Sequence, residues 1–321
     1  MRILAFVIFI PLQLIWLPIT LLAAIYVAFR QLGVSRRLGV SQTAIEIING
    51  RWTMDWFGLR EDIAARRLAA ALPNTSVIGL WLCLLPLWIG SRIAGGPFLY
   101  PTLPDPAEAQ YANLVPSRTV VFDAVIAAHL EDCEQFVVLG AGLDTRAYGP
   151  IKHSALAIFE CDQARDQAHK RRYLDKAGID ASHVHFVTLD FAQENWITAL
   201  LESDYDPAKR TIFLWEGVTL YLARQSVEHT LSLLKTHSAA GSRVIADIYA
   251  HSFLKWTKSK AFNWSLELTG EQTGFGLDFT GAAETELHRF VSAQGLSLGR
   301  HQFLGANGEN GAFVVIAEMV V

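Results

Sequence analysis

An acidic residue lies next to a glycine-rich turn near the middle of the chain, in the stretch FVVLGAGLDTRAYGP at 136–150. The apolar run FVVL predicts a buried strand, and Gly140 and Gly142 would let a ligand approach the backbone without meeting a Cβ atom. Such turns commonly bind phosphate, which the carboxylate of Asp144 would repel. A dinucleotide fingerprint also needs a third glycine, where Thr145 stands. We therefore expect a ligand that has a cationic centre and no phosphate.

Acidic residues also follow the next three predicted strands. The second strand ends in FECDQ, so Glu160 or Asp162 is expected to accept hydrogen bonds from a ribose. The third ends in VTLDF, where Asp190 suits an adenine amino group and Phe191 suits an apolar wall, and the fourth ends in LWEG, with Glu216 at its tip. Ligands of doubly wound folds bind at the carboxyl ends of strands. S-adenosylmethionine, with its ammonium, sulfonium, ribose and adenine, fits these side chains.

The C-terminal two-thirds of the chain must position them, and there short β-rich runs alternate with helical patterns. The predicted strands are 136–139, 155–160, 184–189, 211–215 and 243–248, and the predicted helices are 162–177, 193–203 and 223–240. This alternation predicts a parallel sheet covered on both faces. Only ANGENG separates the last two apolar runs, SLGRHQFLG and GAFVVIAEMVV, so they should form an antiparallel hairpin. The expected fold class is α/β, the seven-stranded Rossmann-like sheet of class I methyltransferases.

The first quarter of the chain holds two apolar segments. Residues 3–29 contain no charged side chain, and roughly 20 apolar residues suffice to cross the ~30 Å hydrocarbon layer. We therefore predict a transmembrane helix at 1–30. It should be retained, because the run is too long for a signal peptide and no cleavage site follows. The second segment, 74–91, is shorter and contains Pro86, and a second span, a re-entrant segment and an interfacial helix are all open for it.

Arginines between the two apolar segments favour a cytoplasmic location for that region, because positive residues collect on the cytoplasmic side. They are Arg30, Arg36, Arg37, Arg51, Arg60, Arg66 and Arg67. We expect one crossing, with 74–91 in the near leaflet, and Glu61 and Asp62 pairing with Arg66 and Arg67 on a solvated helix. The predicted organisation is an anchor, a helical juxtamembrane region at 31–110 that ends in a linker, and a cytoplasmic catalytic domain at 111–321 on the inner membrane.

Composition excludes several function classes. The formal net charge of −4 does not suggest a nucleic-acid partner, which normally meets a basic face. The three cysteines have neither metal-type nor paired spacing, so no metal site and no disulfide framework is expected.

Five motifs resemble, in order and spacing, the leucine carboxyl methyltransferase family, which includes a large bacterial branch of S-adenosylmethionine-dependent methyltransferases. They are SRTVVFDAVI, VVLGAGLDTRAYG, FECDQARDQAHKRRYL, VTLDF and IFLWEGVTLYL, and the resemblance covers roughly residues 115–320. It implies S-adenosylmethionine as cofactor. The resemblance also implies the roles of single residues. By motif position these are Arg118 for the methionine carboxylate, Gly140 as the binding glycine, Asp162 rather than Glu160 for the ribose, Asp190 and Phe191 for the adenine, and Glu216 close to the cofactor. The two apolar N-terminal segments depart from the family, and they argue against its best-known substrate, the C-terminal carboxylate of a protein phosphatase.

The methyl acceptor is less well defined by the sequence. A carboxylate is already ionised at neutral pH and needs no general base, and no histidine lies in a base motif, so carboxyl O-methylation is favoured over hydroxyl O-methylation. His183 and His185 are expected to be structural or exposed. Tyr221 and Arg146 are candidates to face the acceptor, and a packing role for Tyr221 and a surface position for Arg146 are the alternatives. The acceptor would be a small molecule, a lipid or a protein terminus, and catalytic residues are not identified. An NAD-dependent oxidoreductase and a non-catalytic membrane scaffold are the alternative functions.

Overall fold

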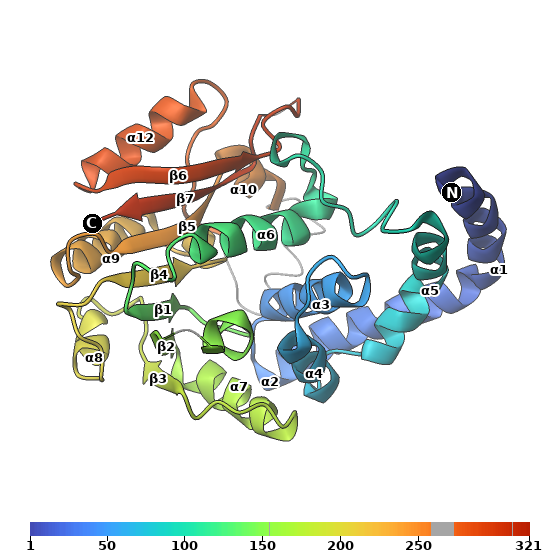
Figure 1. Cartoon of the computed structure of the whole chain (residues 1–321), viewed down its shortest axis with the longest axis horizontal. Helices are drawn as coiled ribbons and strands as arrows, with labels where there is room; N and C mark the ends of the chain where they lie inside the picture. Colours follow the sequence, from blue (N-terminus) through green and yellow to red (C-terminus); the bar gives the residue numbers. More distant parts are fainter. Residues whose placement is uncertain (154, 258–272, 310) are drawn as a thin grey trace.

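The computed structural model describes residues 1–153, 155–257, 273–309 and 311–321. Figure 1 shows a twisted sheet with helices on both faces, and a pair of long helices that extends away from it at the N-terminal end.

The sheet has seven strands in the order β3-β2-β1-β4-β5-β7-β6. Its strands are β1 (Gln135–Leu139), β2 (Ala157–Asp162), β3 (Val184–Thr188), β4 (Thr211–Trp215), β5 (Arg243–Tyr249), β6 (Ser297–Leu304) and β7 (Val314–Val320). β1 to β5 pair in parallel, and β7 is antiparallel to both β5 and β6. The predicted strands, the terminal hairpin and the class I methyltransferase topology are therefore confirmed. Residue 310 of the predicted turn lies outside the described residues.

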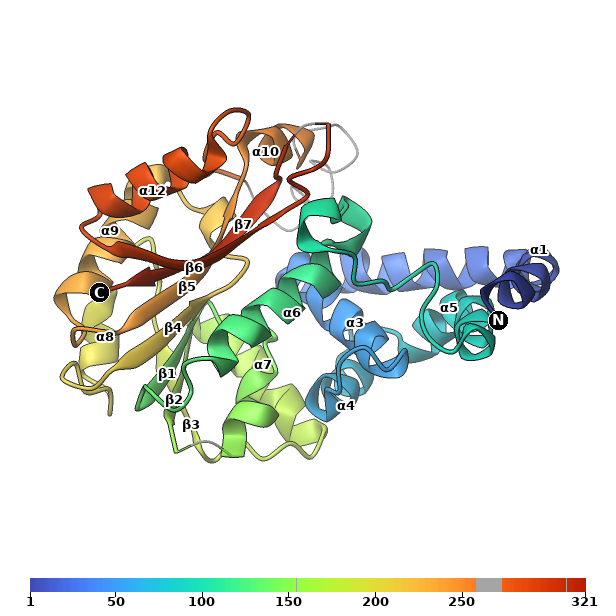
Figure 2. The same cartoon turned by 45° about the horizontal axis from the view of Figure 1, so that its top comes forward.

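Helices cover both faces of the sheet (Figure 2). They include α6 (Leu114–Ala127), α7 (Ala164–Lys176), α8 (Ile197–Leu201), α9 (Arg224–Thr236), α10 (His251–Thr257) and α12 (Ala283–Ala293). The helix predicted at 193–203 is shorter than expected. Asp190 closes a turn before it, because its Oδ1 atom accepts from the Ala192 amide and its carbonyl accepts from the Gln193 amide. These bonds satisfy amides that a longer helix would leave without partners.

Two helices of the expected juxtamembrane region pack on the sheet domain. They are α3 (Gln42–Trp56) and α4 (Ile63–Ala71), and their buried side chains, such as Ile48 and Leu68, belong to the same hydrophobic core as the strands. The predicted pairing of Glu61 and Asp62 with the arginines of α4 is wrong. Asp62 is the N-cap of α4 and accepts from the Ala65 amide, so its carboxylate turns inward, and Arg66 pairs with Asp55.

The two apolar segments form α1 (Arg2–Ala28) and α5 (Val77–Ala94). α1 continues through a π-helical turn, η1 (Phe29–Val34), into α2 (Ser35–Leu38). α1 and α5 pack antiparallel along their length (Figures 1 and 2). The Trp16 indole donates to the Leu82 carbonyl at 2.9 Å, and a Cβ atom on Gly79 would stand 2.7 Å from Val27, so small residues allow a close approach. By length and composition both helices could cross a membrane.

Candidate functional site

One cavity of about 720 Å³ lies at the carboxyl ends of the parallel strands. All seven residues that the sequence nominated for cofactor binding line it: Arg118, Gly140, Gly142, Asp162, Asp190, Phe191 and Glu216. They come from α6 and from the loops after β1 to β4, so the sheet brings together residues that are far apart in sequence. The fold thus forms a single site from them, in the position where doubly wound sheets bind ligands.

The glycine-rich loop after β1 forms the floor of this cavity. Gly140 has φ +68° and Gly142 has φ +42°, which are left-handed conformations that favour glycine. A Cβ atom on Gly140 would lie 2.5 Å from the Cγ2 atom of Val218, in the loop after β4. Asp162 fixes the other side of the loop, since its Oδ2 atom accepts from the Gly142 amide at 2.6 Å. The floor is therefore closely packed and its backbone is held by an acid.

Of the two acids at the end of β2, only Asp162 lines the cavity. Glu160 is 1% exposed and pairs with Lys170 at 2.7 Å, so it points into the interior. Burial raises the pKa of Asp162, although the amides of Gly142 and Gln163 oppose this by hydrogen bonding to the carboxylate. The residue types alone did not decide between these two acids. Their positions do, because Asp162 is the one able to reach a ligand.

The loop after β3 contributes Asp190 and Phe191. The Phe191 ring packs against Trp196 at 5.1 Å and Trp215 at 6.2 Å between ring centroids, and it remains partly exposed in the cavity. Asp190 lines the cavity and also closes the turn before α8. This wall combines an apolar ring face with an acceptor, a combination suited to a purine base.

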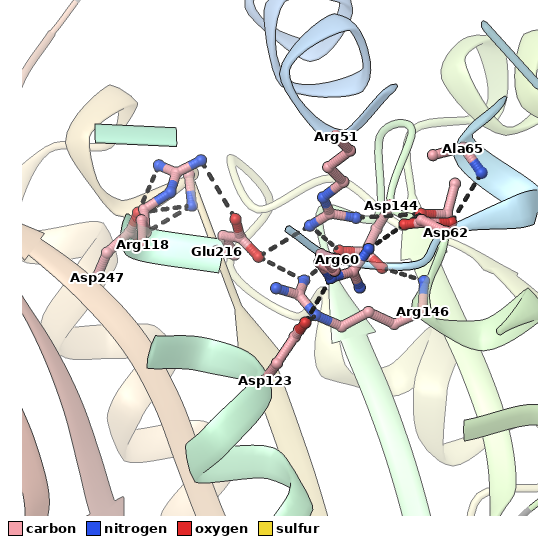
Figure 3. Close-up of polar contacts among 12 residues, drawn as sticks. Arg51, Arg60, Asp62, Ala65, Arg118, Asp123, Asp144, Arg146, Glu216 and Asp247 are labelled. Carbon is pink, nitrogen blue, oxygen red and sulfur yellow. Dashed lines mark hydrogen bonds and ion pairs between the residues drawn. The ribbon is translucent and has the colours of Figure 1, made fainter. Parts of the chain in front are cut away.

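A buried network of charges lies behind the glycine loop (Figure 3). It joins four arginines to five acids: Arg51, Arg60, Arg118 and Arg146 with Asp62, Asp123, Asp144, Glu216 and Asp247. Arg51, from α3, donates to Asp144 at 2.8 Å and to Glu216 at 3.2 Å, and Arg146 reaches the same two acids at 2.5 Å. The loops after β1 and β4 are thereby held together by two guanidinium groups.

Burial alone would raise the pKa of Asp144, but the guanidiniums of Arg51 and Arg146 outweigh it and hold that pKa well below its ordinary value. The pKa of Glu216 is lowered against burial by Arg146, Arg51 and Arg118. Both acids are therefore ionised at neutral pH. This corrects our interpretation of Asp144, because its charge is balanced by arginines within the protein and is no argument against a phosphate ligand.

Arg118 projects from α6 into the cavity wall. Its Nη1 atom donates to Asp247 at 2.8 Å and to the Tyr249 hydroxyl, and its Nη2 atom lies 3.3 Å from Glu216. Among the described residues its buried Nε atom has no hydrogen-bond partner. Both Nη atoms of the guanidinium are thus held by acids, and the donor that has no partner, Nε, is buried.

Several site features were not found in the sequence. Arg51 was counted with the membrane-side arginines but is 1% exposed in the charge network. Residues 39–41, just before α3, and residues 43–47, in its first turns, line the cavity. Asp247 was not singled out, because it lies inside an apolar strand. The prediction that Arg146 faces the acceptor is wrong, since it is 2% exposed and paired with three acids. Tyr221 does line the cavity.

His183 and His185 contact groups that lie outside the cavity. His183 contacts the Ala147 carbonyl through its ring Nε2 atom at 2.8 Å, and His185 pairs with Asp204 at 2.9 Å, so neither lies at the cavity. Among the described residues no group of His, Cys, Asp and Glu side chains could hold a metal ion.

Comparison with known proteins finds similarity over part of the chain. Residues 104–235 match the model of the leucine carboxyl methyltransferase family, in agreement with the resemblance of the motifs, and α1 to α5 lie before the match. A protein of Mycolicibacterium smegmatis named "Putative S-adenosyl-L-methionine-dependent methyltransferase" is 30% identical over 170 residues, which are 52% of this chain and 57% of that protein. A similarly named protein of Streptomyces avermitilis is 32% identical over 150 residues, 45% of this chain and 53% of that protein. The chain thus spans little more than half the length of these relatives.

Among solved structures, magnesium protoporphyrin IX methyltransferase of Synechocystis PCC 6803 with bound SAH is 14% identical, with a TM-score of 0.43, over 66% of this chain and 88% of that one. A DUF574 family protein of Streptomyces avermitilis is 12% identical, with a TM-score of 0.47, over 64% and 83% of the two chains.

Proposed function

We propose that this protein is a membrane-attached methyltransferase that uses S-adenosylmethionine. The observation that carries the proposal is the convergence of the seven nominated residues on one cavity that is large enough for a nucleoside cofactor and a further molecule. The family match over residues 104–235 supports the same activity.

The side chains around the cavity suit the separate parts of this cofactor. Arg118 lines the cavity and would attract the methionine carboxylate by its charge, and Asp162 would accept from the ribose hydroxyls. Asp190 would accept from the adenine amino group, with Phe191 against the ring. Gly140 and Gly142 would let the backbone approach the middle of the cofactor, between its methionine end and its adenine end. Arg118, Asp162 and Asp190 stand at the ends of different elements, so they would fix the cofactor at several points.

S-adenosylmethionine supplies a methyl group on a sulfonium, which an acceptor takes by in-line displacement while the S–C bond breaks and the thioether leaves. The protein's contribution is mainly alignment, which can lower a barrier by ~7–11 kcal/mol. We propose O-methylation of a carboxylate, because that acceptor arrives ionised and requires no proton transfer. A hydroxyl acceptor is the second candidate. It would lie near Tyr221 and Glu46, which line the cavity.

The apolar N-terminal helices support attachment to the inner membrane, with the catalytic domain in the cytoplasm. The continuous helical run from α1 to α2 ends at Gly39, which lines the cavity. From Phe29 to Gly39 is about ten residues, or ~15 Å of helix. The cavity would therefore lie within reach of the membrane surface, which favours a lipidic acceptor or the terminus of a membrane-bound protein.

An NAD-dependent oxidoreductase is the weaker candidate. In dinucleotide-binding folds the glycine loop opens into an α-helix whose N-terminus binds the pyrophosphate. Here the described residues between β1 and β2 contain two short 3₁₀ turns, η4 (Arg146–Tyr148) and η5 (Pro150–His153), and no α-helix. Thr145, in place of the third glycine, bonds to Asp62. Both features remove parts of a pyrophosphate site.

Labelled methyl transfer tests the proposal directly. The full-length protein is incubated with methyl-labelled S-adenosylmethionine and host membrane extract, and the labelled species is isolated. A label that base releases as methanol supports a carboxyl ester, and a base-stable label would sink the carboxylate assignment but leave methyl transfer intact. If the protein binds S-adenosylmethionine in calorimetry yet transfers no label to any fraction, the non-catalytic scaffold becomes the better description. Binding of NAD in its place would revive the oxidoreductase.

A further inference from the structure

The way in which α1 and α5 are tied to the sheet domain has a consequence for membrane attachment. We infer that these two helices lie in the plane of the bilayer, in the leaflet beside the catalytic domain, and that α1 does not cross the membrane. This inference rests on the membrane attachment proposed above, but it replaces the transmembrane helix predicted at 1–30 with a helix on one side only.

Both ends of α1 contact segments that lead directly into the domain. At its C-terminal end the Arg30 side chain donates to the Pro73 carbonyl at 2.6 Å. Near its N-terminal end the Phe9 ring packs edge-on against Phe98, with 5.8 Å between centroids. A helix that crosses a bilayer has its two ends on opposite sides, separated by a ~30 Å layer. Such a layer has to fit between Phe9 and the sheet domain if α1 is to span.

The chain after Phe98 leaves no room for that layer. Thr102 already donates to Asn113 at 3.1 Å, immediately before α6 of the sheet domain. The four residues from Phe98 to Thr102 reach at most ~14 Å when fully extended. Phe98, which the N-terminal part of α1 contacts, is therefore joined to Thr102 by a chain too short to cross the hydrocarbon layer.

The returning segment is also unsuited to lipid. Residues 97–104 contain three prolines and form neither helix nor strand, and within the described part of the chain no backbone hydrogen bond joins them to another segment. Irregular backbone of this kind is not tolerated against hydrocarbon, because its polar groups would lack partners. The end of α5, where this segment begins, must then stay near the membrane surface.

A third contact joins α5 to α3, between the contacts at the two ends of α1. Trp56, at the end of α3, stacks on Trp88 of α5 with 5.5 Å between centroids and 3° between ring planes. α5 is thus placed between α1 and the domain. The face of α1 opposite α5 is therefore left exposed. The exposed fractions of Val7, Leu14 and Ile25 are 63%, 66% and 67%.

The charges of the two segments fit an anionic membrane surface. Residues 1–45 and 73–104 contain arginines and no Asp or Glu. Arg2, Arg36, Arg37 and Arg92 are exposed, and Arg92 lies over the Trp88 ring at 5.6 Å, a pairing suited to the headgroup region. Arginines at the ends of these apolar segments would therefore lie at the level of the lipid headgroups.

Depth measurements distinguish the two arrangements. Val7, Leu14 and Ile25 are spaced by 7 and 11 residues, so they share one face of the helix over ~27 Å of its length. Single nitroxide labels are attached after Val7→Cys, Leu14→Cys or Ile25→Cys in a Cys83→Ala background, and the full chain is bound to phosphatidylethanolamine–phosphatidylglycerol vesicles. Collision with oxygen and with a water-soluble nickel reagent reports the depth of each label.

We expect three similar depths. A label at position 14 that lies far deeper than those at 7 and 25 would overturn the inference and leave membrane attachment standing. A companion measurement reports the side. Cysteines from Arg2→Cys and Glu131→Cys, the latter exposed on the catalytic domain, should react with a membrane-impermeant thiol reagent from the same side of sealed membranes. Reaction from opposite sides would also refute it. If the protein does not bind the vesicles at all, attachment itself fails, whereas cofactor binding, measured separately, is unaffected.

Discussion

Arg51 and Asp144 lie 2.8 Å apart, although 93 residues separate them in the chain. The contact joins α3, which follows directly from the N-terminal helices, to the glycine-rich loop that forms the floor of the cavity. Since residues at the start of α3 also line the cavity, Arg51 holds the covering helix against the floor. The N-terminal segment is thereby part of the site.

Replacing Arg51 should destabilise the protein strongly. Arg51→Leu removes an arginine that pairs with both Asp144 and Glu216 in a buried setting, and breaking such a pair typically costs about 3–5 kcal/mol. Urea unfolding measures the loss. Arg66→Leu is the matched control, because Arg66 is 56% exposed at its side chain and makes one ion pair, worth at most about 1 kcal/mol. Equal effects of the two changes would show that the network contributes no more than a surface pair.

Stability should fall in acid partly through Asp144. Its pKa in the folded protein is below its ordinary value, so the folded state favours the ionised form. The stabilisation is fully present above the ordinary pKa of an aspartate, near 4, and is lost as pH falls from there through the lower folded value. We expect Asp144→Asn to be less stable than the wild type at pH 7 and to lose less stability between pH 5 and pH 3. Unfolding curves across this range that stay parallel for the two proteins would contradict the assignment.

The acid at the end of β2 that binds the ribose can be identified by a pair of isosteric changes. Asp162→Asn should weaken S-adenosylmethionine binding about 10–100-fold, because a hydrogen bond to a charged acceptor is worth about 1.5–3 kcal/mol. Glu160→Gln should leave affinity nearly unchanged while lowering stability, since it disturbs the buried pair with Lys170. Calorimetric titration of each variant decides between them. The opposite order of affinities would assign the ribose to Glu160.

The glycine loop can be probed with two alanine substitutions of matched backbone geometry. Gly140 and Gly178 have φ +68° and +65°, so alanine imposes a similar strain of about 1–2 kcal/mol at each. A Cβ atom on Gly140 would also meet Val218 at 2.5 Å, whereas at Gly178 nothing lies within 4 Å. Gly140→Ala should therefore lose cofactor affinity, and Gly178→Ala should lose only stability. Retained affinity in Gly140→Ala would mean that the loop shifts without disturbing the site.

Local features of the sequence were enough for much of the fold. The runs that form β1 to β4 each end at the glycine turn or at an acid that lines the cavity, so these strands and the site residues could be anticipated together. The terminal hairpin followed from the short distance between its strands. Element ends were less accurate, as at α8, where a turn closed by Asp190 stands in place of the first residues of the predicted helix.

What the sequence alone determined was therefore the set of chemical groups and the sheet that presents them, since period, turn residues and strand ends are local properties. Only the tertiary structure decided which charges meet. Asp144 pairs with Arg51, and Glu160 turns inward while Asp162 stays at the cavity, because ion pairing and burial depend on neighbours that are distant in the chain. The same holds for α1: its apolar run is long enough to span a bilayer, but the contacts at its two ends determine how it can lie.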